Sequence, residues 1–476
     1  MSFQLIIGVK RFPRCRFASS NADSQQTTML PPPRLDYRNI SENFVYKSTN
    51  AINRKAPVTT EAIQSVARLY TELKNHSNTL NAKRNARSMI GEVVRKSAGA
   101  KKLKEEILEL EEIVSRTEQT LLETALAIPN DTHPSAPLGP ESAAVVLASH
   151  GPDLLAATPT RDHVSIAKKL GWLNLESGSQ VTGSSWYYLT NQGALLEMAL
   201  ANYALSVAIK HGFKPVTTPD VVRSDIARRC GFQPRDPANA QASQAYHLQH
   251  LSSAPSPELV LSATSEIPLA GMFANQLLLS TSLPLKVAGI GHAFRAEAGA
   301  SGADTRGLYR VHQFSKVELF AVTTQEASES MMEEMRRVQT TILTELRLPF
   351  RILDMPTEEL GASAYRKYDM EVWMPGRGRW GEVSSLSNCT DFQARRLLIR
   401  YHLQTPKSSG GSTSVPAGNR FAHTLNGTAA AIPRLIVALI ENGIELDDSG
   451  EPVALHLPGV LRPYWLGDNT LIKWQS

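Results

Sequence analysis

The stretch FRAEAGASGADTRGLYRVHQFSKVE, from Phe294 to Glu318, sets arginine, glutamate and phenylalanine side chains around glycine-rich turns. Arg295 can hold a phosphate group through paired charge-assisted hydrogen bonds, and Phe314 can stack on a base. The carboxylates of Glu297 and Glu318 can accept hydrogen bonds from an exocyclic amine or an ammonium group. Together these side chains predict a site that holds a nucleotide beside an amino acid.

The chain lacks the glycine-rich motifs of two common nucleotide-binding folds. Neither GxGxxG after a predicted strand nor GxxxxGK[ST] occurs in the sequence. When ATP activates an amino acid, the carboxylate attacks the α-phosphorus in line, so the site must neutralise phosphate charge and fix the direction of approach. Arginine side chains and a metal ion suit that task.

A second segment, HTLNGTAAAIPR from His423 to Arg434, extends the pattern. Together the two segments closely resemble motifs 2 and 3 of the class II aminoacyl-tRNA synthetases and, within that class, the seryl-tRNA synthetases. The resemblance covers nearly the whole chain apart from its N-terminal end. It implies an α+β fold, in which a class II antiparallel-sheet catalytic domain is flanked by helices and preceded by an antiparallel helical-hairpin (coiled-coil) arm.

The resemblance also implies which residues bind serine. These are Thr264, Ser265, Glu266, Glu318, Asn426 and Thr428. Ser265 stands where alanine is more usual in the family, and Thr428 stands where serine is more usual. Hydrogen bonds to the serine hydroxyl would reject alanine, because alanine would leave polar groups unpaired. Threonine must be excluded by its bulk.

For ATP, the resemblance implies a second set of residues. They are Arg295, Ala296, Glu297, Val311, Phe314, Glu382, Val383, Ser384, Ser385 and Arg434. Val311 and Phe314 match the adenine-binding positions, and Arg434 matches the arginine that meets the γ-phosphate of a bent ATP. Arg295, Glu318 and Arg434 are the implied catalytic residues.

Glu382 and Ser385 match the positions that help to hold Mg²⁺ with ATP in the family, and hard oxygen ligands shared with phosphate oxygens are what Mg²⁺ prefers. The segment GFKPVTTPDVVR, from Gly212 to Arg223, is similar to motif 1. Its proline, Pro219, matches one that lies at the family's dimer interface, which implies a homodimer.

Composition is that of a soluble protein of two or three domains, since 42% of the 476 residues are hydrophobic. Lys and Arg exceed Asp and Glu by five, which permits an anionic partner without demanding one. Cys15, Cys230 and Cys389 are too scattered for a disulfide framework, and no Cys/His cluster suggests zinc. We expect no zinc and no membrane span, because no uninterrupted apolar run approaches about 20 residues.

Residues 1–33 differ from the rest of the chain. Lys10, Arg11, Arg14 and Arg16 lie among apolar and hydroxyl residues, and Asp23 is the one acid before residue 36. Such a composition is typical of a mitochondrial transit peptide, and it predicts delivery to the mitochondrial matrix. A disordered basic tail without a targeting role is the alternative.

The spacing of apolar residues in 34–130 predicts a helical arm. Leu103, Ile107, Leu110, Val114 and further residues at heptad spacing form the seam of one long helix, which a small-residue turn joins to another. Basic residues gather near the tip, and those expected to contact tRNA are Lys83, Arg84, Arg87, Arg95, Lys96, Lys101 and Lys102. A basic surface of this kind can follow a phosphate backbone. The alternative is an ordinary solvated face of a coiled coil.

After a proline-rich linker, residues 131–476 form the predicted catalytic domain. Helical segments such as Leu195–His211 alternate with β-type runs at Leu259–Ser262, Leu285–Gly289, Lys316–Val322 and Met370–Trp373. The stretches 233–257 and 405–419 are predicted to be surface loops or insertions without a catalytic role.

The expected function is that of a serine–tRNA ligase for mitochondrial translation, with ATP, L-serine and tRNA(Ser) as its partners. Only 42 residues follow Arg434 (476 minus 434), which leaves no room for a C-terminal anticodon-binding domain. Recognition of tRNA(Ser) would then depend on the arm. Two alternatives are a non-catalytic paralogue and an RNA-binding coiled-coil protein. The presence of Arg295, Glu318, Glu382 and Arg434 argues against both.

Overall fold

The computed structural model describes residues 29–89, 98–232, 244–249, 257–296, 307–403 and 418–475. The chain divides into two compact units, Met1–Pro31 and Pro32–Ser476. Nearly all of the described residues belong to the second unit. Most of the predicted transit peptide and most of the two predicted insertions lie outside the described residues.

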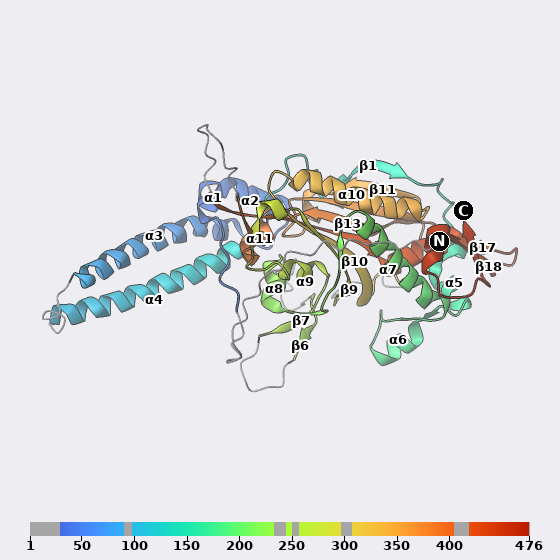
Figure 1. The fold of residues 1–476 in the computed structure, drawn as a ribbon, viewed down its shortest axis with the longest axis horizontal. Helices are drawn as coiled ribbons and strands as arrows, with labels where there is room; N and C mark the ends of the chain where they lie inside the picture. The colour runs from blue at the N-terminus through green and yellow to red at the C-terminus, as the bar shows by residue number, and fades with distance from the viewer. Residues whose placement is uncertain are drawn as a thin grey trace, which may run out of the picture. The chain divides into compact units, whose positions relative to one another are not determined.

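A large mixed sheet forms the centre of the second unit (Figure 1). Neighbouring strands are antiparallel except for the edge pair β4 and β9, which is parallel. In spatial order the eight strands are β1 (Val145–His150), β11 (Phe350–Asp354), β12 (Arg366–Met374), β13 (Arg379–Asn388), β16 (His423–Ala431), β10 (Gln313–Thr323), β9 (Leu285–Phe294) and β4 (Lys214–Thr217). The predicted runs at 285–289, 316–322 and 370–373 are confirmed as parts of β9, β10 and β12.

Strand β10 shows how the sequence divides the sheet into two faces. Successive side chains of a strand point to opposite sides. Val317, Leu319 and Ala321 pack in the main hydrophobic core, while Lys316 and Glu318 belong to the other face. The polar face of β10 is therefore the one that carries the site.

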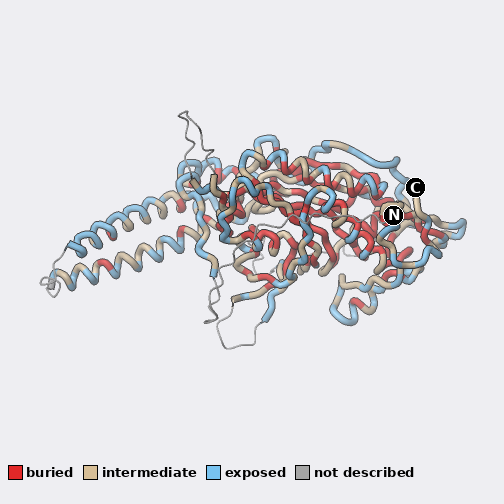
Figure 2. Tube along the Cα trace, viewed as in Figure 1, coloured by how far each residue is buried: buried red, intermediate tan, exposed pale blue. Residues whose placement is uncertain are grey.

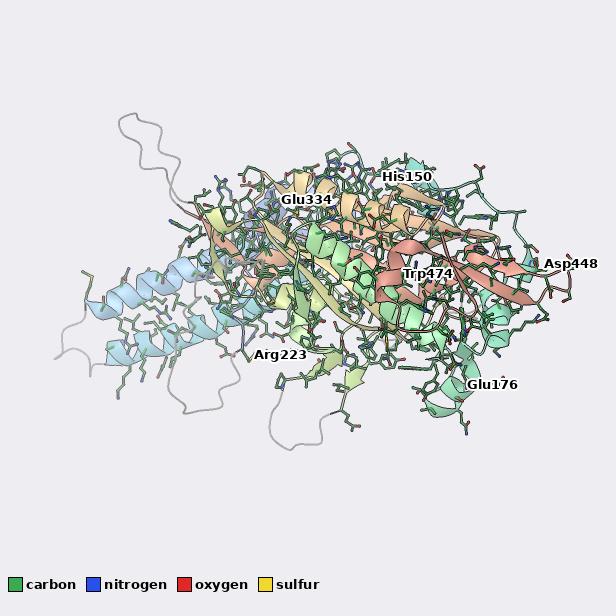
Figure 3. All side chains as sticks on the ribbon, turned by 45° about the vertical axis from the view of Figure 1, so that its right-hand side comes forward. His150, Glu176, Arg223, Glu334, Asp448 and Trp474 are labelled. Atoms are coloured by element: carbon green, nitrogen blue, oxygen red, sulfur yellow. The ribbon has the colours of Figure 1, made fainter. Side chains whose placement is uncertain are left out.

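Three long helices cover the apolar face of the sheet. They are α7 (Gln192–Lys210), α10 (Ser328–Glu345) and α12 (Ile432–Gly443). An ion pair at 2.6 Å links Lys286 of β9 to Glu334 of α10, which is labelled in Figure 3. Figure 2 shows that buried residues are concentrated in the sheet and these helices.

Helix α7 is, among the described helices, the one long and apolar enough to cross a membrane by length and composition. Its Leu196, Leu200 and Tyr203 are buried in the main core. Packing against the sheet accounts for its apolar sequence.

Shorter elements complete the catalytic part. The short helices are α5 (His163–Lys169), α6 (Leu175–Val181), α8 (Ser224–Arg229), α9 (Glu266–Gly271) and α11 (Phe392–Leu397), with 3₁₀ turns at Glu141–Ala143, Pro159–Arg161, Ser280–Ser282, Thr357–Glu359 and Gly459–Tyr464. The small sheets are β5 (Val221–Arg223) with β7 (Leu259–Leu261) and β6 (His247–Leu248); β15 (Asn419–Phe421) with β14 (Arg400–His402) and β8 (Leu277–Leu279); β17 (Ile444–Leu446) with β18 (Pro452–Pro458) and β19 (Ile472–Gln475); and β2 (Leu173–Asn174) with β3 (Tyr188–Leu189).

The predicted N-terminal hairpin is present. Helices α3 (Thr60–Ser88) and α4 (Ala98–Leu126) lie side by side (Figure 1), after two short helices, α1 (Tyr37–Glu42) and α2 (Phe44–Asn53). Ile63 and Val66 of α3 pack with Leu121 and Ala125 of α4 in a separate small core. Leu121 lies on the predicted heptad seam and Ala125 lies beside it, so the pattern predicted part of the contact face of this hairpin.

Candidate active site

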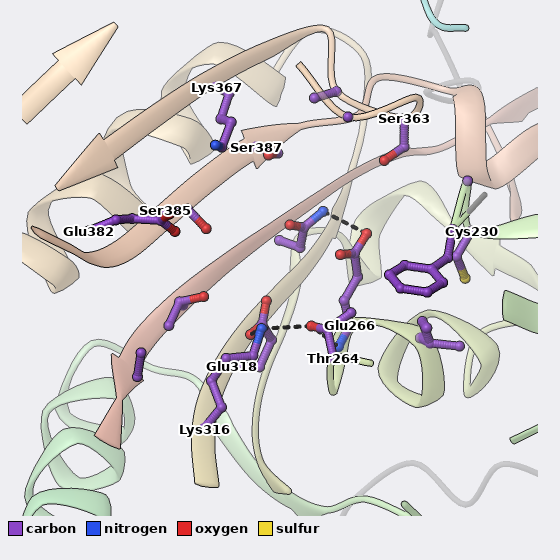
Figure 4. Close-up of a pocket in the computed structure, with 18 of the residues that line it drawn as sticks. Cys230, Thr264, Glu266, Lys316, Glu318, Ser363, Lys367, Glu382, Ser385 and Ser387 are labelled. Atoms are coloured by element: carbon purple, nitrogen blue, oxygen red, sulfur yellow. Dashed lines mark hydrogen bonds and ion pairs between the residues drawn. The ribbon is translucent and has the colours of Figure 1, made fainter. Parts of the chain in front are cut away.

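The polar face of β10, β13 and β16 forms one wall of a cavity of about 360 Å³ (Figure 4). Helix α9 and the segment 359–364 supply other parts of the wall. The predicted site residues that line the cavity are Thr264, Glu266, Arg295, Phe314, Glu318, Glu382, Val383, Ser385, Asn426, Thr428 and Arg434. Residues from four segments far apart in the sequence thus meet in one space.

One end of the cavity is built around a buried ion pair. Lys316 Nζ lies 2.5 Å from Glu318 Oε2 and donates a hydrogen bond to Thr264 Oγ1 at 2.7 Å. All three residues are at most 8% exposed. Because buried charges are stable when they are paired, the lysine holds the carboxylate of Glu318 in place.

Beside this pair, Glu266 accepts two hydrogen bonds at its Oε1 atom. Gln393 Nε2 donates at 2.6 Å and Asn426 Nδ2 donates at 2.9 Å. Burial, together with the nearby charge of Glu318, raises the pKa of Glu266 to about 7. Gln393 is held in turn by Thr424, whose hydroxyl donates to its Oε1 at 2.7 Å.

The floor of the cavity lies where β13 and β16 separate. The two strands pair at only three positions. Beyond them, Gln339 of α10 donates through Nε2 to Ser385 O at 2.7 Å and Thr428 O at 2.9 Å. Ser384 Oγ also donates to Thr428 O. These bonds satisfy carbonyl groups that the ladder leaves unpaired and hold the strands open around the cavity.

At the other end, Arg295 and Phe314 lie together. The guanidinium of Arg295 is 5.3 Å from the centre of the Phe314 ring. The backbone N–H of Arg295 donates to His312 O at 2.8 Å, which ties the end of β9 to the segment before β10. Val311 lies in an adjoining hollow that Arg295, Phe314 and Arg434 also line.

Arg434 and Glu382 contact each other at the same end of the cavity, and both form hydrogen bonds with Tyr309. Arg434 Nη1 lies 3.4 Å from Glu382 Oε2 and donates to Glu382 O at 2.9 Å. The Tyr309 hydroxyl accepts from Glu382 N at 2.9 Å, and Tyr309 O accepts from Arg434 Nε at 3.2 Å. Burial opposes ionisation of Glu382, but Arg434, Lys367 and Arg295 together lower the pKa of this carboxyl below its ordinary value.

Known proteins share this sequence and arrangement. The model of the tRNA synthetase class II core domain (G, H, P, S and T) matches residues 250–443. The mitochondrial serine–tRNA ligase of Schizosaccharomyces pombe is 41% identical over 446 residues, covering 90% of this chain and 88% of that protein. The chain belongs to the seryl-tRNA synthetase family. It is an aminoacyl-tRNA ligase of class II, and its activity is that of a serine–tRNA ligase.

Further relatives agree with the family. The serine–tRNA ligase of Treponema denticola is 39% identical over 442 residues, covering 90% of this chain and 98% of that protein. A crystal structure of seryl-tRNA synthetase from Pyrococcus horikoshii, complexed with ATP, matches with a TM-score of 0.76 and 31% identity. The match covers 90% of this chain and 98% of the Pyrococcus horikoshii chain. The predicted class II fold is confirmed.

Some predicted residues of this seryl-tRNA synthetase lie outside the cavity wall. Ser265 is buried with its Oγ 2.6 Å from where a Cβ of Gly291 would lie, so it packs against the glycine backbone. Ala296 donates from its backbone N–H to Gln244 O at 3.1 Å. Glu297 lies outside the described residues.

On the arm, the structure separates the predicted basic residues into two groups. Lys83 pairs with Glu106, and Arg84 pairs with Glu111 at 2.7 Å, across the hairpin. Arg87, Lys101 and Lys102 are exposed, whereas Arg95 and Lys96 lie outside the described residues. The paired residues have a structural role that the sequence did not reveal.

Sequence reasoning missed several residues that shape the cavity. Lys316 was recognisable, because it lies two positions from both Phe314 and Glu318 on one strand. Gln393 and Tyr309 carry no comparable local signal, since their partners come from distant segments. Lys367 also lines the cavity, and its Nζ donates to Asp369 Oδ2 at 2.6 Å.

One group of possible metal ligands occurs among the described residues. Asp162, His163 and Glu441 approach one another away from the cavity. Glu441 Oε1 is 2.8 Å from His163 Nδ1, and Glu441 Oε2 accepts from the N–H groups of Gly376 and Arg377. Hydrogen bonds already occupy both carboxylate oxygens, so the group is a structural link.

Proposed function

We propose that the cavity binds serine and ATP together, forms seryl-adenylate and then passes the seryl group to the 3′ end of tRNA(Ser). The observation that carries this assignment is the convergence of Arg295, Glu318 and Arg434 on one cavity. Glu318 supplies a carboxylate suited to an ammonium group, and Arg295 and Arg434 supply guanidinium groups suited to phosphates. These three residues are the proposed catalytic set.

Serine is proposed to occupy the buried end. Its ammonium group would pair with Glu318, and its hydroxyl would meet Glu266, Thr264, Asn426 or Thr428. The Oε1 atom of Glu266 already accepts two bonds. Among the described residues none donates to its Oε2, which leaves this atom for the substrate. A pocket with such groups rejects alanine, because they would stay unpaired.

ATP is proposed to occupy the half-buried end. Phe314 would stack on adenine beside Val311, Arg295 would meet the α-phosphate, and Arg434 would meet the γ-phosphate. The backbone of Ala296 and the side chain of Glu297 complete the proposed contacts. Two cations at this end oppose the charge of the triphosphate and lower the barrier to attack by the carboxylate.

Mg²⁺ is proposed to bind with ATP at Glu382 and Ser385, beside Val383 and Ser384. The donor set fits, since the lowered pKa of Glu382 keeps its carboxylate ionised at neutral pH and Ser385 adds a hydroxyl to the cavity wall. When bound, the ion neutralises phosphate charge. The residues of the chain hold and orient the two substrates around it.

The proposal extends to partners and location. We assign residues 34–130 to a tRNA-binding arm and 131–476 to the catalytic domain, in a homodimer that uses the motif 1 segment around Pro219. The matrix of the mitochondrion is the proposed location, with no membrane contact. The basic sequence of residues 1–33 supports it, as do mitochondrial relatives from Schizosaccharomyces pombe and Saccharomyces cerevisiae.

Serine-dependent ATP/pyrophosphate exchange tests the catalytic proposal. The purified chain with Mg²⁺ is supplied with serine, threonine or alanine in turn. Exchange with serine and at least about tenfold less with the other two is expected. A folded chain that supports no exchange with any of the three would overturn the assignment.

The arm is tested by two matched double variants. Lys101→Ala with Lys102→Ala removes two exposed charges, and the salt dependence of tRNA(Ser) binding should fall by about 1.5 in log–log slope. Lys83→Ala with Arg84→Ala removes residues already paired with glutamates and should change the slope less. Equal effects from both pairs would contradict the proposed contact surface.

A further inference from the structure

Lys316 occupies the central position of the site-facing row on β10. Phe314, Lys316 and Glu318 alternate along the strand and therefore share one face, with about 6.7 Å between successive members. The residues opposite Lys316 are Gly291 on β9 and Ala431 on β16. Neither neighbour has a side chain large enough to cover the lysine, so its ammonium group reaches the cavity.

The hydrogen bonds of Lys316 are incomplete. An ammonium group has three N–H donors. Thr264 Oγ1 accepts one of them, Glu318 Oε2 lies at ion-pair distance without accepting a hydrogen bond, and no other described residue accepts from Nζ. Lys316 is 5% exposed, and a buried donor normally has a partner. A ligand in the cavity can supply the missing acceptor (Figure 4).

The expected substrate positions identify that acceptor. On the proposed function, on which this inference rests, Glu318 binds the serine ammonium and Phe314 stacks on adenine. The serine carboxylate and the α-phosphate then meet between these two residues, over the position of Lys316. Both groups are anionic, so a fixed cation there lowers the barrier to their approach.

We propose that Lys316 is a further catalytic residue, whose ammonium group contacts the serine carboxylate where it attacks the α-phosphate. In this step a carboxylate oxygen forms a bond to the α-phosphorus, and the bond from phosphorus to the bridging oxygen of pyrophosphate breaks. The electron pair leaves with pyrophosphate. Lys316 retains its proton throughout and acts by charge and hydrogen bonding.

The arrival of serine also changes the surroundings of Lys316. The substrate ammonium competes with the lysine for Glu318 Oε2. Each N–H that the lysine releases becomes available to the carboxylate of the same substrate molecule. The ion pair seen in the structure therefore holds Glu318 ready for serine and keeps the lysine beside the reacting atoms.

Lys316→Met tests the proposal, with Lys286→Met as a matched control. Lys286 also belongs to the central sheet and pairs with a glutamate at 2.6 Å, but it lies outside the cavity. Serine-dependent exchange should show kcat reduced by about 10²- to 10³-fold in Lys316→Met, as when one charge-stabilising donor is removed. The control should stay within about twofold of the unsubstituted chain.

Separate values of kcat and KM distinguish a catalytic role from a positioning role. If Lys316 only orients Glu318, its loss would raise the KM for serine and leave kcat at saturation unchanged, which would overturn the proposal. Lys316→Arg, which retains the cation, should keep more of kcat than Lys316→Gln. Equal kcat values for Lys316→Arg and Lys316→Gln would also overturn the proposal. If Lys316→Met does not fold, these two variants replace it in the test.

The exchange assay distinguishes failure of the proposed function from failure of the assignment of Lys316. Absence of exchange in the unsubstituted chain would overturn the proposed function and this assignment together. Exchange in the unsubstituted chain with full kcat in Lys316→Met would overturn the assignment of Lys316 alone.

Discussion

The two ends of the cavity are built differently. At the end assigned to serine, Glu318 and Lys316 are at most 5% exposed and pair with each other. At the end assigned to ATP, Arg295 and Glu382 are half-buried. The first end is therefore organised before any ligand arrives, whereas the second presents charge to solvent.

This difference matches the demands of the two ligands. A small amino acid offers few contacts, so its selection requires fixed polar groups that are left unpaired by the wrong substrate. A triphosphate carries enough charge to be held by cations and Mg²⁺ over a wider surface. Substitutions at the two ends should therefore affect different steps.

The largest effect is expected at the ATP end. Arg295→Ala removes the guanidinium assigned to the α-phosphate and should reduce kcat/KM for pyrophosphate exchange by about 10³-fold. Binding of tRNA(Ser) should change little, because the arm is remote in sequence and forms its own core. Exchange at the rate of the unsubstituted chain would refute the role of Arg295.

At the serine end, Glu318→Gln should reduce kcat/KM for serine by about 10²-fold. The change removes the charge that pairs with the ammonium and leaves Lys316 buried without a carboxylate. The KM for ATP should stay within about twofold of its starting value. A larger rise in the KM for ATP than in the KM for serine would contradict the assignment of Glu318 to the serine end.

Local patterns predicted three of the eight strands of the central sheet, β9, β10 and β12, and the family resemblance supplied the order of the site residues. The predicted β-type run at 316–322 placed Glu318 on a strand, and the heptad seam identified part of the contact face of the hairpin. These features depend on residues close together in the chain, and their periodicity is a direct consequence of backbone geometry.

Residues that support the site from distant segments could not be predicted in this way. Gln393 lies 127 positions from Glu266, and no local pattern indicates that they are hydrogen bonded. The pairing of Lys83 with Glu106 depends on the register of two helices. Charge counted along the sequence assigned Lys83 to tRNA, whereas the structure places an acid beside it.

Opposite pKa shifts at the two ends give a smaller but sharper test. The pKa of Glu266 is about 7 in the folded chain, against an ordinary value of 4.5. Between these values the folded state binds a proton that the unfolded state has released, so the free energy of unfolding falls as pH rises. The lowered pKa of Glu382 acts in the other direction, and its stabilisation is lost as pH falls.

Melting temperatures of Glu266→Gln and Glu382→Gln should therefore respond differently to a change from pH 5 to pH 8, because only the transition of Glu266 lies in that range. From pH 5 to pH 8, the melting temperature of Glu266→Gln relative to the unsubstituted chain should rise by about 2 °C. That of Glu382→Gln should rise less. Asp369, whose pKa is raised to about 7 by burial and in part by the charge of Glu382, cancels in the comparison with Glu266→Gln, whereas in Glu382→Gln its shift is smaller. A parallel rise in both variants would contradict the contrast between the two ends.

The smallest effect is expected from Tyr309→Phe, which removes one hydroxyl at the ATP end. That hydroxyl accepts from Glu382 N, while the ring lies 4.7 Å from the Arg434 guanidinium and would remain. Loss of one hydrogen bond of about 0.7 kcal/mol should raise the KM for ATP about threefold and leave the KM for serine unchanged. Tyr309→Leu removes the ring as well and should raise the KM for ATP further, because Arg434 then loses its aromatic support. If instead both variants raised the KM for serine, Tyr309 would connect the two ends, and the cavity would respond to substitution as one unit.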